Sequence, residues 1–229
     1  MRRALLLGSA LVAASAFGVG TAGATNECRG LNPCVPVAGP WVLVPLGNSV
    51  PRPQVQYVLS CPKGYIVGGL DAELTDRAID VAFLGKSGSP VNPGITTSRT
   101  AVFSATYVGG SARAPSFRPH IGCMPGGGRR TPTSVSAVVP PGEPTVRLVR
   151  NVRLGTGATK RIVLACAAGE RLIAAYDARA FDTAKPPTQQ MVSEFTVTRT
   201  VGGNRVVVKA RSGTAGAVVQ VSTVCAGGR

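Results

Sequence analysis

The stretch "VLSCPKGYIVGGLDA" occupies residues 58–72, and a related stretch, "VLACAAGERLIAAYDA", occupies residues 163–178. Each passes from Val-Leu into a cysteine, reaches a glycine three residues later and continues through an apolar run to Asp-Ala. Placing Cys61 opposite Cys166, at an offset of 105 residues, matches the apolar positions on both sides. Self-similarity at a fixed spacing is typical of a structural unit that occurs more than once. The sequence therefore predicts two copies of one unit.

The cysteines support this reading, because each copy has a second cysteine about 60 residues after the first. Six cysteines allow many pairings, and the repeat selects one disulfide per copy and a small ring near the N-terminus. The expected disulfides are Cys61–Cys123, Cys166–Cys225 and Cys28–Cys34. Closing the long loops stabilises each copy by roughly 4 kcal/mol. A zinc site is the competing use of cysteines, but no C-x-x-C occurs and His120 is the only histidine.

The alignment can be extended in both directions from the first cysteines. Upstream, Trp41–Val44 falls opposite Val146–Val149, and downstream one inserted residue matches Asp71-Ala72 to Asp177-Ala178. An Asp-Ala pair at a shared position predicts the start of a turn, in which the carboxylate accepts hydrogen bonds from backbone amides two residues on.

Both copies have the residue pattern of β-strands. Short runs rich in Val, Ile, Phe, Tyr and Thr are separated by Gly, Pro, Ser and Asn clusters, and no window shows a helical stripe of ten or more residues. In residues 205–211, Val206, Val208 and Ala210 share one face and the arginines and lysine share the other. The expected fold is all-β, with two tandem antiparallel, immunoglobulin-like β-sandwich domains that each contain one disulfide.

The expected organisation has five parts. These are a signal peptide (1–24), an N-terminal arm with a small disulfide ring (25–36), a first β-sandwich domain (37–125), a linker (126–137) and a second β-sandwich domain (138–229). The signal peptide is predicted from Arg2 and Arg3, the apolar stretch after them and an A-x-A cleavage site at Ala22 and Ala24. An uncleaved membrane anchor is the alternative, although the apolar stretch is short for a span of roughly 20 residues. We therefore expect a secreted, extracellular protein with no membrane span.

The chain is strongly basic. After residue 24 it has 23 Lys and Arg against 10 acids, a net charge of +13, which would attract anionic surfaces such as teichoic acids. Eighteen of these cations are Arg, which a GC-rich genome also explains. The cations are spread singly and lack interleaved aromatics that stack bases, so no nucleic-acid partner is expected.

Catalytic motifs are hard to find. His120 lies three residues before a disulfide cysteine on an expected strand, which favours a structural role, and Trp41 begins an apolar strand, which favours a core position over a sugar platform. No G-x-S-x-G or phosphate-binding glycine loop occurs, and "MPGGGRR" at 124–130 is interpreted as part of a linker. We expect no catalytic residues, no cofactor-binding residues, no metal ligands and no enzymatic activity.

The acids are few, and four of them lie within ten residues: Asp71, Glu73, Asp76 and Asp80. We interpret them as turn or solvated loop residues. Two alternatives stay open, a calcium site built from their oxygens and acid–base chemistry on a glycoside.

The arm "TNECRGLNPCVPVAGP", residues 25–40, is the first candidate for contact with a partner. Its ring restricts the chain before binding, and its Pro-rich end favours an extended backbone that could add a strand to a sheet. The candidate contact residues are Arg29, Leu31, Asn32, Val35 and Val37. The alternative is a staple that packs on its own domain.

The first copy has the pattern C-P-x-G, a Gly-Gly pair and a closing cysteine, formed by Cys61, Pro62, Gly64, Gly68-Gly69 and Cys123. This pattern resembles a β-sandwich domain common in secreted proteins of high-GC Gram-positive bacteria, which implies a fold and a compartment. The second copy has alanines in place of the proline and the Gly pair. The twin β unit with its ringed arm also resembles adaptor subunits of umbrella toxin particles.

These features together predict a secreted, non-enzymatic protein-binding module, an adaptor or scaffold subunit of an extracellular, antibacterial toxin complex. Its expected partner is another secreted protein. The alternative is a basic cell-wall-associated protein that binds anionic surface polymers through its scattered arginines.

Overall fold

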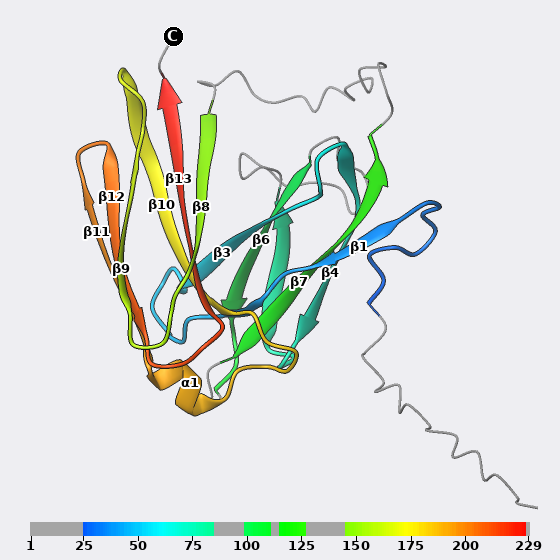
Figure 1. Cartoon of the computed structure of the whole chain (residues 1–229), viewed down its shortest axis with the longest axis horizontal. Helices are drawn as coiled ribbons and strands as arrows, with labels where there is room; N and C mark the ends of the chain where they lie inside the picture. The colour runs from blue at the N-terminus through cyan, green and yellow to red at the C-terminus, as the bar shows by residue number, and fades with distance from the viewer. Residues whose placement is uncertain (1–24, 85–98, 111–114, 127–144, 228–229) are drawn as a thin grey trace, which may run out of the picture.

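A computed structural model describes residues 25–84, 99–110, 115–126 and 145–227 (Figure 1). Its first-copy strands are β1 (Val35–Ala38), β2 (Trp41–Leu43), β3 (Gln54–Ser60), β4 (Tyr65–Leu74), β5 (Ile79–Leu84), β6 (Thr100–Tyr107) and β7 (Ser116–Pro125). The second copy contains β8 (Thr145–Arg153), β9 (Thr159–Ala165), β10 (Glu170–Phe181), α1 (Gln189–Ser193), β11 (Phe195–Gly202), β12 (Arg205–Ser212) and β13 (Ala217–Gly227). The expected signal peptide, and the expected linker apart from residue 126, lie outside these residues.

All strand pairs in this part of the chain are antiparallel, so the prediction of an all-β, antiparallel fold is confirmed. The strands form a sheet of seven (β1, β2, β4, β7, β8, β10 and β13) and two sheets of three (β3-β6-β5 and β11-β12-β9). No helix in the described residues is long and apolar enough to cross a membrane.

The repeat is visible in the register of corresponding strands. Val67 in β4 lies opposite Cys123 in β7, and Leu172 in β10 lies opposite Cys225 in β13. In both pairs a bulge follows at the next residue. The three-stranded sheets β3-β6-β5 and β9-β12-β11 also correspond, because each begins with the strand that ends directly before the first cysteine of its copy.

The upstream part of the sequence alignment was wrong. Val35 in β1 lies opposite Cys123, and Val146 in β8 lies opposite Cys225, so Val146 corresponds to Val35 and not to Trp41. Strand β8 therefore corresponds to β1 and β2 taken together. In the sequence alone, short apolar runs can be aligned with one another at several offsets. The correct offset is known only once the residue that pairs with Cys123 or Cys225 is known.

The downstream alignment was also wrong. Asp71 lies opposite His120, three residues before the first-copy cysteine, whereas Tyr176 lies opposite Ser222, three residues before the second-copy cysteine. The aspartate of the first copy thus corresponds to Tyr176, without an inserted residue. Both Asp71-Ala72 and Asp177-Ala178 lie inside strands, so neither begins a turn.

The three disulfides are those that the repeat predicts: Cys28–Cys34, Cys61–Cys123 and Cys166–Cys225. In each copy the first cysteine directly follows a strand of a three-stranded sheet, and the second lies in the seven-stranded sheet. Each long-range bridge therefore joins two sheets of its copy, and the Cys61–Cys123 bridge lies within the first-copy core.

The seven-stranded sheet contains strands from both copies. Strand β2 lies between β7 and β10, with Val42 opposite Phe117 on one side and opposite Ala180 on the other. Trp41, the only tryptophan, is 2% exposed in this strand, which confirms its prediction as a core residue. The two copies are thus joined through backbone hydrogen bonds.

Strand β13 is buried on both faces, which its sequence alternation did not indicate. Val219 and Val221 pack in the core between β13 and the sheet β11-β12-β9. On the opposite face, Val218 belongs to the core of the first copy. Figure 1 shows β13 between the orange strands of the second copy and the strand β3 of the first.

Gln220 joins the two copies on that face. Its side-chain oxygen accepts a hydrogen bond from the Val58 amide at 2.6 Å, and its amide nitrogen donates to the Val58 carbonyl at 2.9 Å and to Asn151 at 2.8 Å. The side chain thus makes the two backbone hydrogen bonds to Val58 that a neighbouring strand would otherwise make. Because Gln220 is 1% exposed, water cannot readily take over these bonds.

A second buried polar group lies beside it. Arg147 in β8 donates hydrogen bonds to Gln56 at 2.9 Å and to Ser222 at 3.4 Å, and its guanidinium lies 5.4 Å from the ring centre of Tyr176. Burial lowers the pKa of Arg147, and the neighbouring Tyr176 partly offsets this. These partners satisfy a charge that would otherwise be costly to bury.

Replacing Gln220 with Met should destabilise the protein by about 2–4 kcal/mol, because the side-chain volume is kept while two backbone groups of Val58 lose their partners. Urea unfolding with intact disulfides measures this loss. The exposed substitution Gln190→Met is the control and should change stability by less than about 0.5 kcal/mol. Equal losses of stability in the two variants would contradict a stabilising role for the hydrogen bonds of Gln220.

Candidate interaction surfaces

The N-terminal arm packs on its own copy. Strand β1 pairs with β7, with Val37 opposite Ile121. The staple alternative is therefore correct for residues 35–38: this extended segment adds a strand to its own sheet rather than leaving it available for a partner's sheet. Val37 is half-buried and packs against the first-copy core, so it anchors the arm to its own copy.

The residue before the ring sits on a pair of glycines. The backbone carbonyl of Glu27 lies against Gly69 in β4 and Gly122 in β7, which are opposite each other in the register. A Cβ at either glycine would overlap that carbonyl. The corresponding residues of the second copy are Ala174 and Val224, which are likewise paired. Gly69 and Gly122 therefore form the site on which the arm packs, which we call the glycine seat. The sequence signal for this site is that the second copy has no glycine at either position.

Asp71 holds the start of the arm. One of its carboxylate oxygens accepts a hydrogen bond from the Asn26 backbone amide at 2.7 Å, and the other accepts from the Ala72 amide at 2.8 Å. The arm is thus fixed on both sides of its disulfide ring, by Asp71 and the glycine seat before it and by β1 after it.

His120 lies under the arm between two carboxylates. Its Nδ1 is 3.9 Å from Glu27 and its Nε2 is 3.8 Å from Glu73, and the ring is largely buried. Burial lowers the pKa of His120 below its ordinary value. Glu27 opposes this shift, Arg118 adds to it, and Glu73 and Asp71 oppose it more weakly. The histidine therefore favours its neutral form in the folded protein.

The four clustered acids do not converge on one point. Asp71 and Glu73 lie on β4 and contact the arm and His120. Asp76 forms the only turn of the predicted kind among the four, since its carboxylate accepts from the Ala78 amide at 2.8 Å and from the Tyr107 hydroxyl at 3.0 Å. Asp80 is exposed on β5.

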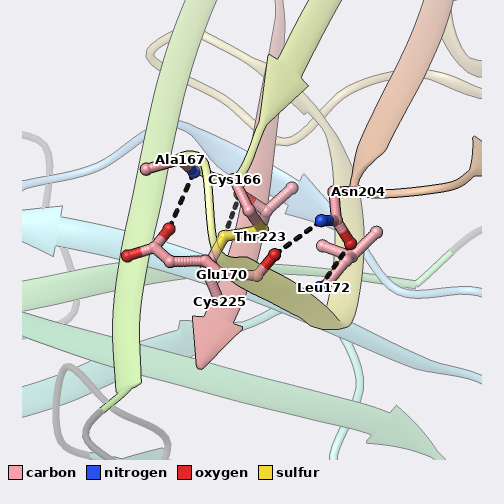
Figure 2. The surroundings of a disulfide bond; sticks show 7 residues. All are labelled: Cys166, Ala167, Glu170, Leu172, Asn204, Thr223 and Cys225. Atoms are coloured by element: carbon pink, nitrogen blue, oxygen red, sulfur yellow. Dashed lines mark hydrogen bonds between the residues drawn. A yellow bond between two sulfur atoms is a disulfide. The ribbon is translucent and has the colours of Figure 1, made fainter. Parts of the chain in front are cut away.

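Among the described residues, the only set of three potential metal ligands close together is Cys166, Glu170 and Cys225. Its sulfurs form a disulfide, which removes the thiolates that a metal would need. Figure 2 shows the surroundings: Glu170 accepts from the Ala167 amide, and the Asn204 side chain donates to the Glu170 carbonyl and accepts from the Leu172 amide, both in β10. The Asn204 backbone carbonyl accepts from the Cys166 amide before the turn. This constellation fixes the turn between β9 and β10.

A cleft of about 430 Å³ lies where the copies meet, bordered by β3, β8 and the Gly39-Pro40 segment. Its charged groups are already paired, because Arg153 donates to Asp182 at 2.6 Å. Burial raises the pKa of Tyr57, helped by the negative charge of Asp182, so the phenol keeps its proton. The cleft offers hydrogen-bonding groups rather than a nucleophile.

The ring itself faces outward. Of the expected contact residues, Arg29, Asn32 and Val35 are exposed and Leu31 is half-buried. In Figure 1 the ring belongs to the dark blue segment that precedes β1 at the edge of the molecule. The structure therefore groups four of the five expected contact residues around one short loop.

No protein-family model matches the chain, and no curated protein matches it.

Replacing Gly122 with Ala should loosen the arm, because the new methyl group would collide with the Glu27 carbonyl and lie close to the Cys34 sulfur. We expect a loss of about 1–3 kcal/mol in stability and faster hydrogen exchange of the β1 amides. Gly202→Ala is the control, since nothing lies within 4 Å of a Cβ at that position. Unchanged protection of β1 in the first variant would contradict the seat.

Stability should fall as the pH drops below about 6.5, the ordinary pKa of histidine. Because the pKa of His120 is lower in the folded protein, the unfolded chain binds a proton at a higher pH than the folded chain does. Lowering the pH from about 6.5 towards the folded-state pKa therefore decreases the free energy of unfolding. His120→Gln removes the only histidine and should flatten the change in unfolding free energy between about pH 7.5 and about pH 5.5. The same slope in both proteins, or a wild type that gains stability on acidification, would contradict this account.

Proposed function

We propose that this protein is a secreted, non-enzymatic adaptor that binds another protein through the Cys28–Cys34 ring. In this proposal the two copies are immunoglobulin-like sandwich units, and the complex is extracellular and antibacterial, as the resemblance to adaptor subunits implies. The three disulfides favour an oxidising compartment.

The observation that supports the proposal best is the anchoring of the ring. The chain is fixed immediately before the ring by the glycine seat and immediately after it by β1. The disulfide closes the six-residue separation between the two cysteines. A loop held in this way loses little conformational entropy when it binds, so its contacts contribute more fully to affinity.

The exposed groups of the ring fit a protein surface. Arg29 supplies a cation with five hydrogen-bond donors, Asn32 supplies both donors and acceptors, and Val35 and Leu31 supply apolar area. Arginine surrounded by smaller apolar contacts is a common centre of binding energy in protein interfaces. A partner with an acidic pocket and an apolar rim would complement this arrangement.

The double variant Arg29→Glu/Asn32→Ala should reduce binding of the partner by about tenfold or more, because it reverses the central charge and removes a hydrogen-bonding side chain. The measurement is quantitative recovery of co-purifying proteins from culture supernatant of the producing strain. Arg52→Glu, an exposed charge reversal outside the ring, is the control. Proteins recovered equally with all three baits would count against the ring as the binding site.

A further inference from the structure

The outer face of the sheet β11-β12-β9 has an unusual composition. Val206, Val208 and Ile162 point into the second-copy core, so the alternate residues point outward. We call these outward residues the basic face: Thr159, Arg161, Val163, Ala165, Thr196, Thr198, Thr200, Gly202, Arg205, Val207, Lys209 and Arg211. The face contains four cations, four threonines and no acid.

Its cations are adjacent rather than scattered, unlike the sequence-based expectation. Lys209 lies directly opposite Arg161 across β12 and β9, and Arg211 is one outward position further along β12. Like charges directly opposite in a sheet repel each other and oppose folding. All three side chains are exposed, and Thr196 and Thr198 lie opposite Arg211 and Lys209 on the other side.

The acids of the second copy are occupied elsewhere. Asp177 accepts a hydrogen bond from Arg199 at 2.9 Å, and Asp182 accepts from Arg153 at 2.6 Å. Glu170 accepts from a backbone amide in the turn drawn in Figure 2, and Glu194 lies beside Gln190. Within the described residues these are the only acids of the second copy, so none of them neutralises the basic face.

The positive charge is concentrated in this half of the protein. Residues 145–227 contain twelve Lys and Arg against four acids, a net charge of +8. The described residues between 25 and 126 contain six against five, a net charge of +1. A polyanion approaching the molecule would therefore be drawn to the second copy.

We propose that the basic face binds a phosphodiester polymer of the wall teichoic acid type. Arginine presents a planar fork to phosphate oxygens, lysine presents a point charge, and threonine hydroxyls donate hydrogen bonds. Outward residues on a strand stand about 7 Å apart, so an extended polymer can meet several cations in series.

The shape of the face favours a polymer over a single anion. Its residues lie on an open sheet surface, with a shallow hollow only at the end formed by Ala165, Gly202 and Arg205. An exposed ion pair contributes little by itself. Several such contacts made by one chain add up through multivalency. Strands β9, β11 and β12 place no aromatic residue on the face, which removes the stacking platform that single-stranded nucleic acids use.

This site is separate from the ring, which lies in the first copy, and it does not depend on the proposed protein partner. A molecule with both surfaces would hold a protein at one end and a wall polymer at the other.

The test uses the full mature chain and purified poly(glycerol phosphate) in a titration at low and moderate salt. The variant Arg161→Gln/Lys209→Gln/Arg211→Gln should weaken binding about a hundredfold, and the affinity of the wild type should fall as salt rises. The matched control Arg52→Gln/Lys63→Gln/Arg77→Gln removes the same charge from exposed first-copy positions and should weaken binding less than about threefold.

Equal losses in the two triple variants would overturn the site, because binding would then follow net charge alone. Failure of the wild type to bind at low salt would overturn it as well. Oligothymidylate of equal charge that bound as tightly would overturn the assignment to a wall polymer. The face variant should melt at the wild-type temperature or above, since it loses like-charge repulsion, and a lower melting temperature would contradict the strained charge pair.

Discussion

The pairing of β2 with strands of both copies is the constraint on which the rest of the structure depends. Through it the two copies share one sheet, and the outer face of β13 becomes a second buried face. That burial explains the polar residues of β13: Gln220 bonds to Val58 of the first copy, and Ser222 accepts from Arg147, which in turn donates to Gln56 of the first copy.

The two copies also differ at the two proposed surfaces. Glycines opposite each other in β4 and β7 accept the arm in the first copy, and Ala174 and Val224 fill that place in the second. The second copy instead carries the charge, on the outer face of the sheet β11-β12-β9. One copy therefore holds a rigid loop outward, and the other presents a flat cationic sheet.

The sequence predicted the features that depend on local pattern and on the repeat. Runs rich in Val, Ile, Phe, Tyr and Thr predicted the all-β fold, and the repeated spacing of the cysteines predicted Cys61–Cys123 and Cys166–Cys225. The two remaining cysteines predicted the third disulfide. The sequence could not predict which strands meet across the copies, because a side chain such as Gln220 finds its partner 162 residues away. The sequence predicted part of the basic face, because the alternation of residues 205–211 places their cations on one side of a strand. That Arg161 lies opposite Lys209 could be known only from the pairing of β9 with β12.

The shared sheet can be tested most directly through Trp41, the only tryptophan, which lies in β2 between the copies. The measurement is equilibrium urea unfolding of the disulfide-intact protein, followed at once by tryptophan fluorescence and by far-ultraviolet circular dichroism. A shared sheet predicts a single transition with coincident midpoints, because the copies lose their common strand together. Two separated transitions, with the fluorescence change confined to one of them, would contradict it.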